Sequence, residues 1–233
     1  MPERVQEVAI SAESWSAEGV MRWAFSQFHP EVALVTAFGP EGLVLIDMAA
    51  RLGTKFRIIT VDTDFLFAET YALIERVERH YQLIVERVRP VLSPQEQERS
   101  HGRALWKRAP DKCCQLRKVD PLRTKLVELR AWMTGIRRDQ TAARRSTRKI
   151  AWDTKFGLVK ISPLADWSTE QIWNYLYTND VPYNPLHDRA YPSIGCTFCT
   201  RKVLPGEDSR AGRWAGSNKT ECGLHVLSEE ASV

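Results

Sequence analysis

The five cysteines of the 233-residue chain fall into two pairs and one singleton. Cys113 and Cys114 are adjacent, Cys196 and Cys199 enclose two residues, and Cys222 stands alone near the carboxyl end. Paired thiolates are suited to holding a metal centre, whereas a lone thiolate is suited to nucleophilic attack. The cysteine pattern therefore predicts four residues that bind and one that reacts.

The spacing of the paired cysteines bears on which metal they would hold. A Cys-x-x-Cys motif is typical of a zinc site or of a redox pair. Adjacent cysteines fit one tetrahedral ion poorly, whereas on an iron–sulfur cubane neighbouring thiolates can each bind a different iron. The pattern favours a cluster over zinc, with four buried, metal-free cysteines as the structural alternative. Lys118, one helical turn after Cys114, would offset the charge of such a centre.

Cys222 lies in the segment Lys219-Thr-Glu-Cys-Gly-Leu-His225. Lys219 and His225 each stand three residues from the thiol, and nearby cations raise the thiolate fraction of a cysteine. The segment is a candidate nucleophilic site, with an incidental tail cysteine as the alternative. Residues 204–233 are rich in glycine, serine and charge, with Trp214 as the large anchor, so we expect a mobile tail after a domain of residues 1–203.

Three further stretches are suited to an anionic or nucleotide ligand. The turn from Thr36 to Gly42 joins an expected strand to an expected helix, where backbone N–H groups and the helix dipole can hold an anion, although many such turns bind nothing. Asp62-Thr63-Asp64 ends the next expected strand and is suited either to a ribose or to capping a helix. The basic run of residues 137–149 is either a solvated face or a site for bidentate recognition of phosphate or sulfate.

Composition and charge exclude several classes of protein. Apolar residues make up 43% of the chain and charged residues 27%, as in ordinary globular proteins. The net charge of +4 suits an anionic ligand but is too weak to indicate nucleic-acid binding. There is no run of about 18 apolar residues and no apolar signal core at the start, so we expect neither a membrane span nor export. A cytoplasmic location follows, where structural disulfides are disfavoured.

The elements that must position these residues follow from hydrophobic periodicity. Short apolar runs predict buried strands over 32–37, 56–61, 83–88, 131–134 and 158–161, and helical spacing predicts helices over 16–28, 43–52, 67–81, 93–106, 111–119, 122–129 and 168–177. Pro121 is suited to starting the helix over 122–129, and Ser168-Thr-Glu-Gln171 is a capping box. The alternation predicts an α/β fold with a mainly parallel sheet, helices on both faces and a ligand at the carboxyl ends of the strands.

Six motifs of the chain together resemble the bacterial assimilatory adenylyl-sulfate (APS) reductases, the iron–sulfur branch of the family that also contains phosphoadenylyl-sulfate (PAPS) reductases. The motifs are Cys113-Cys-Gln-Leu-Arg-Lys118 with Pro121-Leu122, Gly135-Ile-Arg-Arg-Asp-Gln140, Tyr183-Asn-Pro-Leu-His-Asp188, Tyr191-Pro-Ser-Ile-Gly-Cys-Thr-Phe-Cys199, Arg210-Ala-Gly-Arg-Trp214 and Glu221-Cys-Gly-Leu-His225. The resemblance spans about residues 36–225. The chain departs from the family pattern at Ala37 and Pro40 of the first turn, and at Asp64, where glycine or asparagine is usual.

The resemblance implies a fold like that of the adenine-nucleotide α-hydrolases and one 4Fe–4S cluster on Cys113, Cys114, Cys196 and Cys199. It also implies that Lys118 lies between the cluster and the substrate sulfate, and that Cys222, Lys118 and His225 form the catalytic set. The substrate-binding residues that it implies come from two strand ends and from the arginines: Thr36, Phe38, Gly39, Glu41, Asp62, Thr63, Arg137, Arg138, Arg210 and Arg213.

The activity implied by this resemblance is the thioredoxin-dependent reduction of APS to sulfite and AMP, in sulfate assimilation and cysteine biosynthesis, through an S-sulfonate on Cys222. The expected partners are thioredoxin, APS and AMP, in a homo-oligomer (a dimer or tetramer) without nucleic acid or membrane. The nearest alternative is a dual APS/PAPS or a PAPS reductase. Two others are a tRNA sulfurtransferase, whose Ser-Gly-Gly turn this chain lacks, and a zinc-stabilised binding module in which Cys222 is dispensable.

Overall fold

Six strands form one sheet in the order β3-β2-β1-β4-β6-β5 in the computed structural model, which describes residues 2–217, 219 and 221–224. The strands are β1 (Val32–Val35), β2 (Arg57–Val61), β3 (Val85–Val88), β4 (Ala131–Met133), β5 (Ile150–Asp153) and β6 (Leu158–Ile161). Every neighbouring pair is parallel except β5 with β6. The predicted mainly parallel sheet is confirmed.

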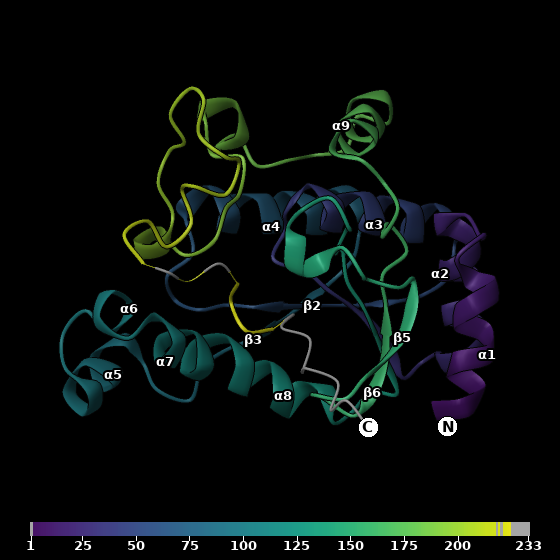
Figure 1. Cartoon of the computed structure of the whole chain (residues 1–233), viewed down its shortest axis with the longest axis horizontal. Coiled ribbons are helices and arrows are strands. Elements are labelled where there is room, and N and C mark those ends of the chain that lie inside the picture. The colour runs from purple at the N-terminus through teal and green to yellow at the C-terminus, as the bar shows by residue number, and fades with distance from the viewer. Residues whose placement is uncertain (1, 218, 220, 225–233) are drawn as a thin grey trace.

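Helices cover both faces of the sheet (Figure 1). One layer holds α3 (Pro40–Arg51) and α4 (Ala68–Tyr81), and α9 (Thr169–Thr178) packs on α3. Helix α1 (Pro2–Ala12) packs against β5, and α2 (Ala17–Phe28) packs against β1. The opposite layer holds α5 (Pro94–His101), α6 (Leu105–Arg108), α7 (Pro110–Cys114) and α8 (Asp120–Leu126). Within the described chain, no helix is long and apolar enough to cross a membrane.

The strands read as continuous apolar runs because both of their faces are buried. Successive side chains of a strand point to opposite faces. In β1, Leu34 joins the core cluster under α2, α3 and α4, whereas Val35 joins the second cluster, under α8. In β4, Met133 lies in the first cluster and Trp132 in the second. The two cores together fix the register of the sheet.

The order of the strands reverses beside β1. The chain proceeds outward from β1 to β2 and β3, and then returns to place β4 on the other side of β1. Thr36 follows β1, and Thr134 follows β4, so both lie at the same edge of the sheet. Ligands of open parallel sheets bind at such a reversal, at the carboxyl ends of the strands.

The structure corrects the predicted helices around the first cysteine pair. The expected helix over 93–106 is two helices, because Gly102 has a φ of 77° and ends α5. The expected helices over 111–119 and 122–129 are one continuous run, in which residues 115–119 form a π-helical turn between α7 and α8. Pro121 therefore does not start a separate helix. Its ring lacks an N–H and displaces a preceding carbonyl group, and the wider π turn accommodates that disruption.

Two elements were not predicted from the sequence. Helix α1 packs against β5, and β5 pairs antiparallel with β6 through a turn whose Gly157 has a φ of 73°. Strand β5 is an edge strand that follows the basic run directly, and it is buried only at its first residue, Ile150. The apolar signal of a buried strand is therefore weak there.

Candidate active site

A cavity of about 620 Å³ opens at the carboxyl ends of the strands, beside the reversal of strand order. Its floor comes from the ends of β1, β2 and β4, and its sides come from the start of α3, from α9 and from residues 187–224. Segments that are distant in the sequence meet here, since the carboxyl-terminal segment runs back across this edge (Figure 1). The cavity is large enough for a nucleotide-sized ligand.

The turn between β1 and α3 places backbone N–H groups at the cavity. Thr36 Oγ1 accepts a hydrogen bond from the Phe38 backbone N–H at 2.9 Å, and Gly39 precedes α3 as its N-cap. A Cβ atom on Gly42 would lie 1.9 Å from Thr36 Oγ1, so only glycine permits this close turn. Thr36, Gly39 and Glu41 line the cavity, as expected of a site that binds an anion at a helix start.

Phe38 occupies a different position from the one expected. Its backbone has a φ of 59°, and its side chain is 2% exposed and packs into the main core. The left-handed turn directs the ring inward while the neighbouring residues face the cavity. Phe38 is not among the described lining residues, so its position does not support a side-chain contact with the ligand.

The end of β2 connects the cavity to the cysteines. Thr63 lines the cavity, and its Oγ1 lies 3.3 Å from Cys196 Sγ. Asp62 does not reach the described cavity wall, because its buried carboxylate accepts hydrogen bonds from Tyr71 Oη at 2.6 Å and Arg89 Nε at 3.2 Å. Asp62, which was expected at the nucleotide, is therefore held at the end of β2 by these two hydrogen bonds.

Arg137 is held by the protein itself. Its side chain is 4% exposed; its Nε donates to Glu41 at 3.1 Å, and one Nη group donates to both carboxylate oxygens of Asp139. The other Nη group donates to Thr169 Oγ1 at 3.0 Å. Arg137 lines the cavity, but its guanidinium already has these acceptors, so it supports the start of α3.

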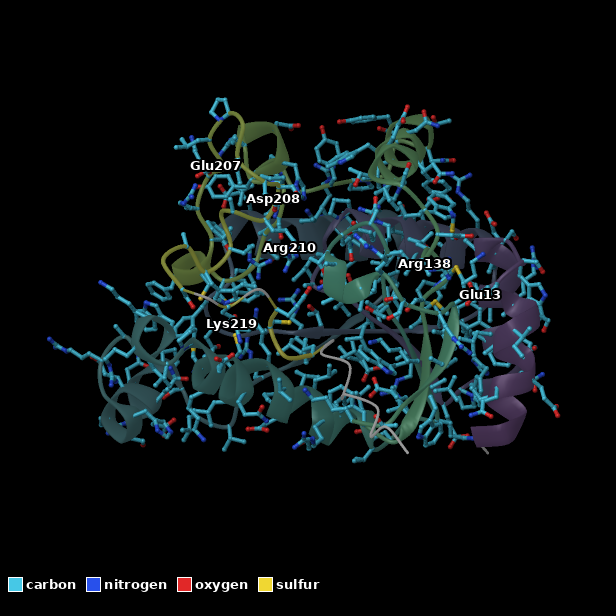
Figure 2. The ribbon with its side chains drawn as sticks, viewed as in Figure 1. Glu13, Arg138, Glu207, Asp208, Arg210 and Lys219 are labelled. Carbon is cyan, nitrogen blue, oxygen red and sulfur yellow. The ribbon has the colours of Figure 1, made fainter. Side chains whose placement is uncertain are left out.

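Arg138 points away from the cavity. Its guanidinium donates to the Thr147 carbonyl and pairs with Glu13, and Figure 2 shows Arg138 beside Glu13 on the α1 side of the molecule. Arg138 lies in the turn that follows β4, and its side chain leaves the chain in another direction than that of Arg137. Of the two arginines expected at the substrate, Arg137 therefore lines the described cavity and Arg138 does not.

Besides Arg137, three cations of the expected set reach the cavity wall: Lys118, Arg210 and Arg213. Arg213 Nη1 donates to Ser193 Oγ at 3.1 Å, while its buried Nε has no hydrogen-bond partner in the described chain. Burial lowers the pKa of Arg210. Burial also opposes the charged form of Lys118, but nearby thiolates outweigh it and raise the pKa of its ammonium. A buried group of cations that includes an unpaired donor favours an anionic ligand.

Sequence reasoning missed one cation and one histidine of this wall. Arg144 lines the cavity and pairs with Glu221 at 2.6 Å; it was assigned only to the general basic run. His187 also lines the cavity, and burial lowers the pKa of its imidazole. The motif containing His187 was noted without a role, because sequence spacing does not show that residues 187 and 144 meet.

The four paired cysteines lie near enough to one another and to Lys118 to interact electrostatically. All are free thiols; Cys113, Cys114 and Cys196 are buried, and Cys199 is half-buried. Burial raises the pKa of Cys113 to about 12, and the other three thiols act in the same direction. The described Cys, His, Asp and Glu side chains contain no group of three spaced for one ion, and a tetrahedral zinc requires sulfurs about 4 Å apart. Four free thiols are the donor set that a 4Fe–4S cubane requires, one for each iron.

Cys222 lines the same cavity as Lys118, Arg210 and Arg213, and it is half-buried. Lys219 pairs with Asp111 of α7, so its ammonium has an acceptor other than the thiol. His225 lies outside the described residues. The described part of the carboxyl-terminal segment is anchored by Trp214, which is 4% exposed.

Comparisons with known proteins agree with this geometry. Residues 31–202 match the model of the phosphoadenosine phosphosulfate reductase domain. Proteins named adenosine 5'-phosphosulfate reductase are similar to the chain: that of Halalkalibacterium halodurans is 46% identical over 95% of this chain and 96% of its own length, and that of Salinibacter ruber is 43% identical over 97% and 90%.

Solved structures show the same fold. The phosphoadenylyl-sulfate reductase of Candida auris, solved as a phosphate complex, superimposes with a TM-score of 0.74 at 34% identity, covering 84% of this chain and 96% of that chain. The FMN adenylyltransferase of Candida glabrata, with FMN and an ATP analogue, has a TM-score of 0.58 at 16% identity, covering 83% and 64%. The second likeness shows the shared fold alone.

Proposed function

The chain belongs to the phosphoadenosine phosphosulfate reductase domain family, and we propose that it reduces adenosine 5'-phosphosulfate to sulfite and AMP. The observation that carries this proposal is the presence of Cys222 on the same cavity wall as Lys118, Arg210 and Arg213. A thiol nucleophile thereby faces a buried, cationic cavity at the strand edge where nucleotides bind. The names of the similar bacterial proteins support APS as the substrate.

The nucleotide would lie along the floor of the cavity. Thr36, Gly39, Glu41 and Thr63 would hold its nucleoside part and α-phosphate near the start of α3. Lys118, Arg210 and Arg213 would hold the phosphosulfate group. These cations neutralise the charge that develops as the bond between sulfur and the phosphate oxygen breaks. In this arrangement Arg137 supports the nucleotide turn through Glu41.

The first chemical step would be attack by the Cys222 thiolate on the sulfur of APS. A bond forms between Cys222 Sγ and that sulfur, the bond from sulfur to the phosphate oxygen breaks, and AMP leaves with the electron pair. The product on the enzyme is a Cys222 S-sulfonate. His225, which neighbours Cys222 in sequence, is a further candidate for assisting this step.

The second step would use the two thiols of thioredoxin. One thioredoxin thiolate attacks Cys222 Sγ and displaces sulfite, and its second thiol then resolves the mixed disulfide. Cys222 returns as a thiol and thioredoxin leaves as a disulfide. The segment that carries Cys222 must close over the nucleotide in the first step and meet thioredoxin in the second, so we propose that residues 204–233 act as a mobile tail beyond a domain of residues 1–203.

Cys113, Cys114, Cys196 and Cys199 would hold one 4Fe–4S cluster, a proposal supported by their four free thiols. When bound, the cluster would supply a fixed charge and a structural tie between α7 and residues 196–199. Lys118 would stand between that charge and the substrate sulfate, where its ammonium stabilises both. Neither chemical step requires electrons from it.

The proposal places the enzyme in the cytoplasm, in sulfate assimilation and cysteine biosynthesis, as a homo-oligomer without nucleic acid or membrane. A dual or PAPS-directed reductase is the second candidate, because the solved relative at 34% identity is named a PAPS reductase. Parallel assays with APS and PAPS separate the two. We expect kcat/KM to be higher with APS, since the curated relatives of 42–46% identity are named APS reductases.

The experiment that tests the proposal is a single turnover with 35S-labelled APS in the absence of thioredoxin. We expect one sulfonate per chain on the wild-type protein, located on the Cys222 peptide by mass spectrometry, and none on Cys222→Ser. The variant should still bind AMP, because only its nucleophile is lost. A Cys222→Ser protein that still becomes sulfonated would contradict the proposed mechanism.

A further inference from the structure

Three charged contacts, from three different elements, hold the described residues around Cys222. Lys219 pairs with Asp111 of α7, Glu221 pairs with Arg144 beyond β4, and the Gly223 carbonyl accepts a hydrogen bond from Lys155 in the turn between β5 and β6. Contacts before and after the cysteine determine where its thiol lies. The position of Cys222 on the cavity wall therefore depends on these contacts.

The contact made by Glu221 is the most extensive of the three. Its two carboxylate oxygens accept from Arg144 Nη2 at 2.6 Å and from Arg144 Nε at 2.9 Å, which is a bidentate pair. Thr141 Oγ1 donates to the same carboxylate at 3.2 Å, and Arg210 Nη2 lies 3.7 Å from it. One carboxylate thus meets two of the arginines that line the cavity.

The Glu221–Arg144 pair is more deeply buried than the other ion pair at the site, which Lys219 forms with Asp111. The side chains of Glu221 and Arg144 are 9% and 11% exposed, whereas Asp111, the partner of Lys219, is 85% exposed. Water and salt screen exposed pairs, so these contribute little, whereas removing one partner of a buried pair leaves an uncompensated charge. The Glu221–Arg144 pair is therefore the stronger of the two ion pairs that fix the segment.

We propose that Glu221 is a positioning residue, whose bond to Arg144 seats Cys222 on the wall of the anion cavity. The inference rests on the proposed function, in which Cys222 is the nucleophile. Glu221 itself does not touch the reacting sulfur. Its carboxylate balances Arg144 and Arg210, and in doing so it holds the adjacent thiol over the place where the sulfate is bound.

This role predicts opposite effects on nucleotide binding and on chemistry. In Glu221→Gln, the positive charge of Arg144 and Arg210 is no longer balanced by a carboxylate, so an anionic nucleotide binds at least as tightly. The segment is released, however, so the thiol is on the wall for less of the time. We expect KM for APS to stay equal or to fall, and kcat to fall about tenfold, which corresponds to about 1.4 kcal/mol.

The deciding readout is the rate at which iodoacetamide alkylates Cys222, followed by mass spectrometry of its peptide with and without AMP. The matched control is Glu207→Gln, because Glu207 is also a glutamate that pairs with an arginine, Arg201. Glu207 lies on the outer edge of the molecule (Figure 2). We expect alkylation about tenfold faster in Glu221→Gln than in wild type. We expect no change in the control.

Equal alkylation rates and equal kcat values in Glu221→Gln, the control and wild type would overturn the inference. Glu221→Asp keeps the charge but shortens the reach, so its alkylation rate should lie between those of wild type and Glu221→Gln. This variant replaces Glu221→Gln in the test if Glu221→Gln does not fold.

The alkylation assay does not depend on reductase activity. A wild-type protein that fails to reduce APS thus contradicts the proposed function, whereas an active wild type with an unaffected Glu221→Gln contradicts this inference alone.

Discussion

The adjacent residues Arg137 and Arg138 have different roles because their guanidinium groups have different surroundings. Arg137 is 4% exposed and bound by Glu41 and Asp139, whereas the Arg138–Glu13 pair is about one-third exposed on both sides. A buried charge must be compensated, so the residues around Arg137 are committed to it. An arginine with such partners is a structural support, whereas Arg213, with an unpartnered buried Nε in the described chain, keeps a donor for a ligand.

This difference predicts unequal losses of stability. Arg137→Met leaves Glu41 and Asp139 without their cation, and we expect it to lower the free energy of unfolding by about 3 kcal/mol. Arg138→Met, the matched control, removes a partly exposed pair and should cost about 1 kcal/mol or less. Urea denaturation of both variants measures the difference. If Arg137→Met were as stable as Arg138→Met and instead failed to bind AMP, Arg137 would be a ligand of the nucleotide.

Backbone conformation explains a second residue-scale feature, the position of Asp64 at the end of β2. Asp64 has a φ of 57°, in the left-handed region that glycine and asparagine adopt most readily. Its backbone N–H donates to Asp62 at 3.1 Å, and its carboxylate pairs with the buried Arg117. Those contacts offset the cost of the conformation and tie the end of β2 to the π-helical turn that carries Lys118.

At the scale of elements, the edge of the sheet is joined by charges as well as by backbone bonds. Arg57 of β2 donates to both carboxylate oxygens of Glu86 of β3, at 2.6 and 2.8 Å, and Lys125 of α8 also reaches Glu86 at 3.0 Å. The hydrogen bonds from Arg57 lower the pKa of Glu86 to about 2. The ionised carboxylate of Glu86 therefore helps to hold β2, which Asp62 and Thr63 follow, against β3.

The sign of the pH dependence follows from that shift. The folded-state pKa of Glu86 is depressed, so its stabilisation is present above its unfolded pKa of about 4.5 and is lost as the pH falls toward about 2. We expect Glu86→Gln to be about 1 kcal/mol less stable than wild type at pH 7, because the pair is partly exposed. The difference should shrink in urea titrations at pH 4 and, further, at pH 3, which lies between the unfolded and folded pKa values.

Glu98→Gln provides the comparison for that series. Glu98 pairs with Arg103, whose side chain is 93% exposed, so its removal should change stability little at any of these pH values. A deficit in Glu86→Gln that stays constant from pH 7 to pH 3 would contradict the proposed role of its ionisation.

At the scale of the whole molecule, the metal centre would connect the two halves of the chain. Cys113 and Cys114 follow β3 and end α7, whereas Cys196 and Cys199 belong to the segment beyond α9. Holding one cluster would therefore join the helical layer under the sheet to the segment that supplies Arg210 and Arg213. Binding a group only in the folded state stabilises the fold.

This arrangement predicts the composition and stability of the protein as purified. Anaerobic preparations should contain about four irons and four acid-labile sulfides per chain, with little zinc. Removing the metal with a chelator should lower Tm, and Cys196→Ser should hold less iron from the outset. Metal analysis and thermal melts of both samples are the measurements. Zinc without labile sulfide would exclude the cluster and favour a metal-stabilised binding module.

Much of this protein follows from its sequence alone. Apolar runs placed five of the six strands, because a strand buried on both faces needs apolar residues at nearly every position. The cysteine pairs and the lone Cys222 predict separate binding and reacting thiols, because thiolate chemistry depends on residue type. The break at Gly102, the pairing of β5, the first helix and the π turn before Pro121 were missing or different, since their signals depend on neighbours in space.

The tertiary structure decided which of the candidate residues share one wall. Arg137 and Arg138 are neighbours in sequence, yet the first lines the cavity and the second points toward α1. Arg144 and Glu221 are 77 residues apart, yet they form the buried pair beside Cys222. Residue types limit the chemistry that is available. The distance between two charges and their burial decide whether they compensate one another, and the folded chain sets both.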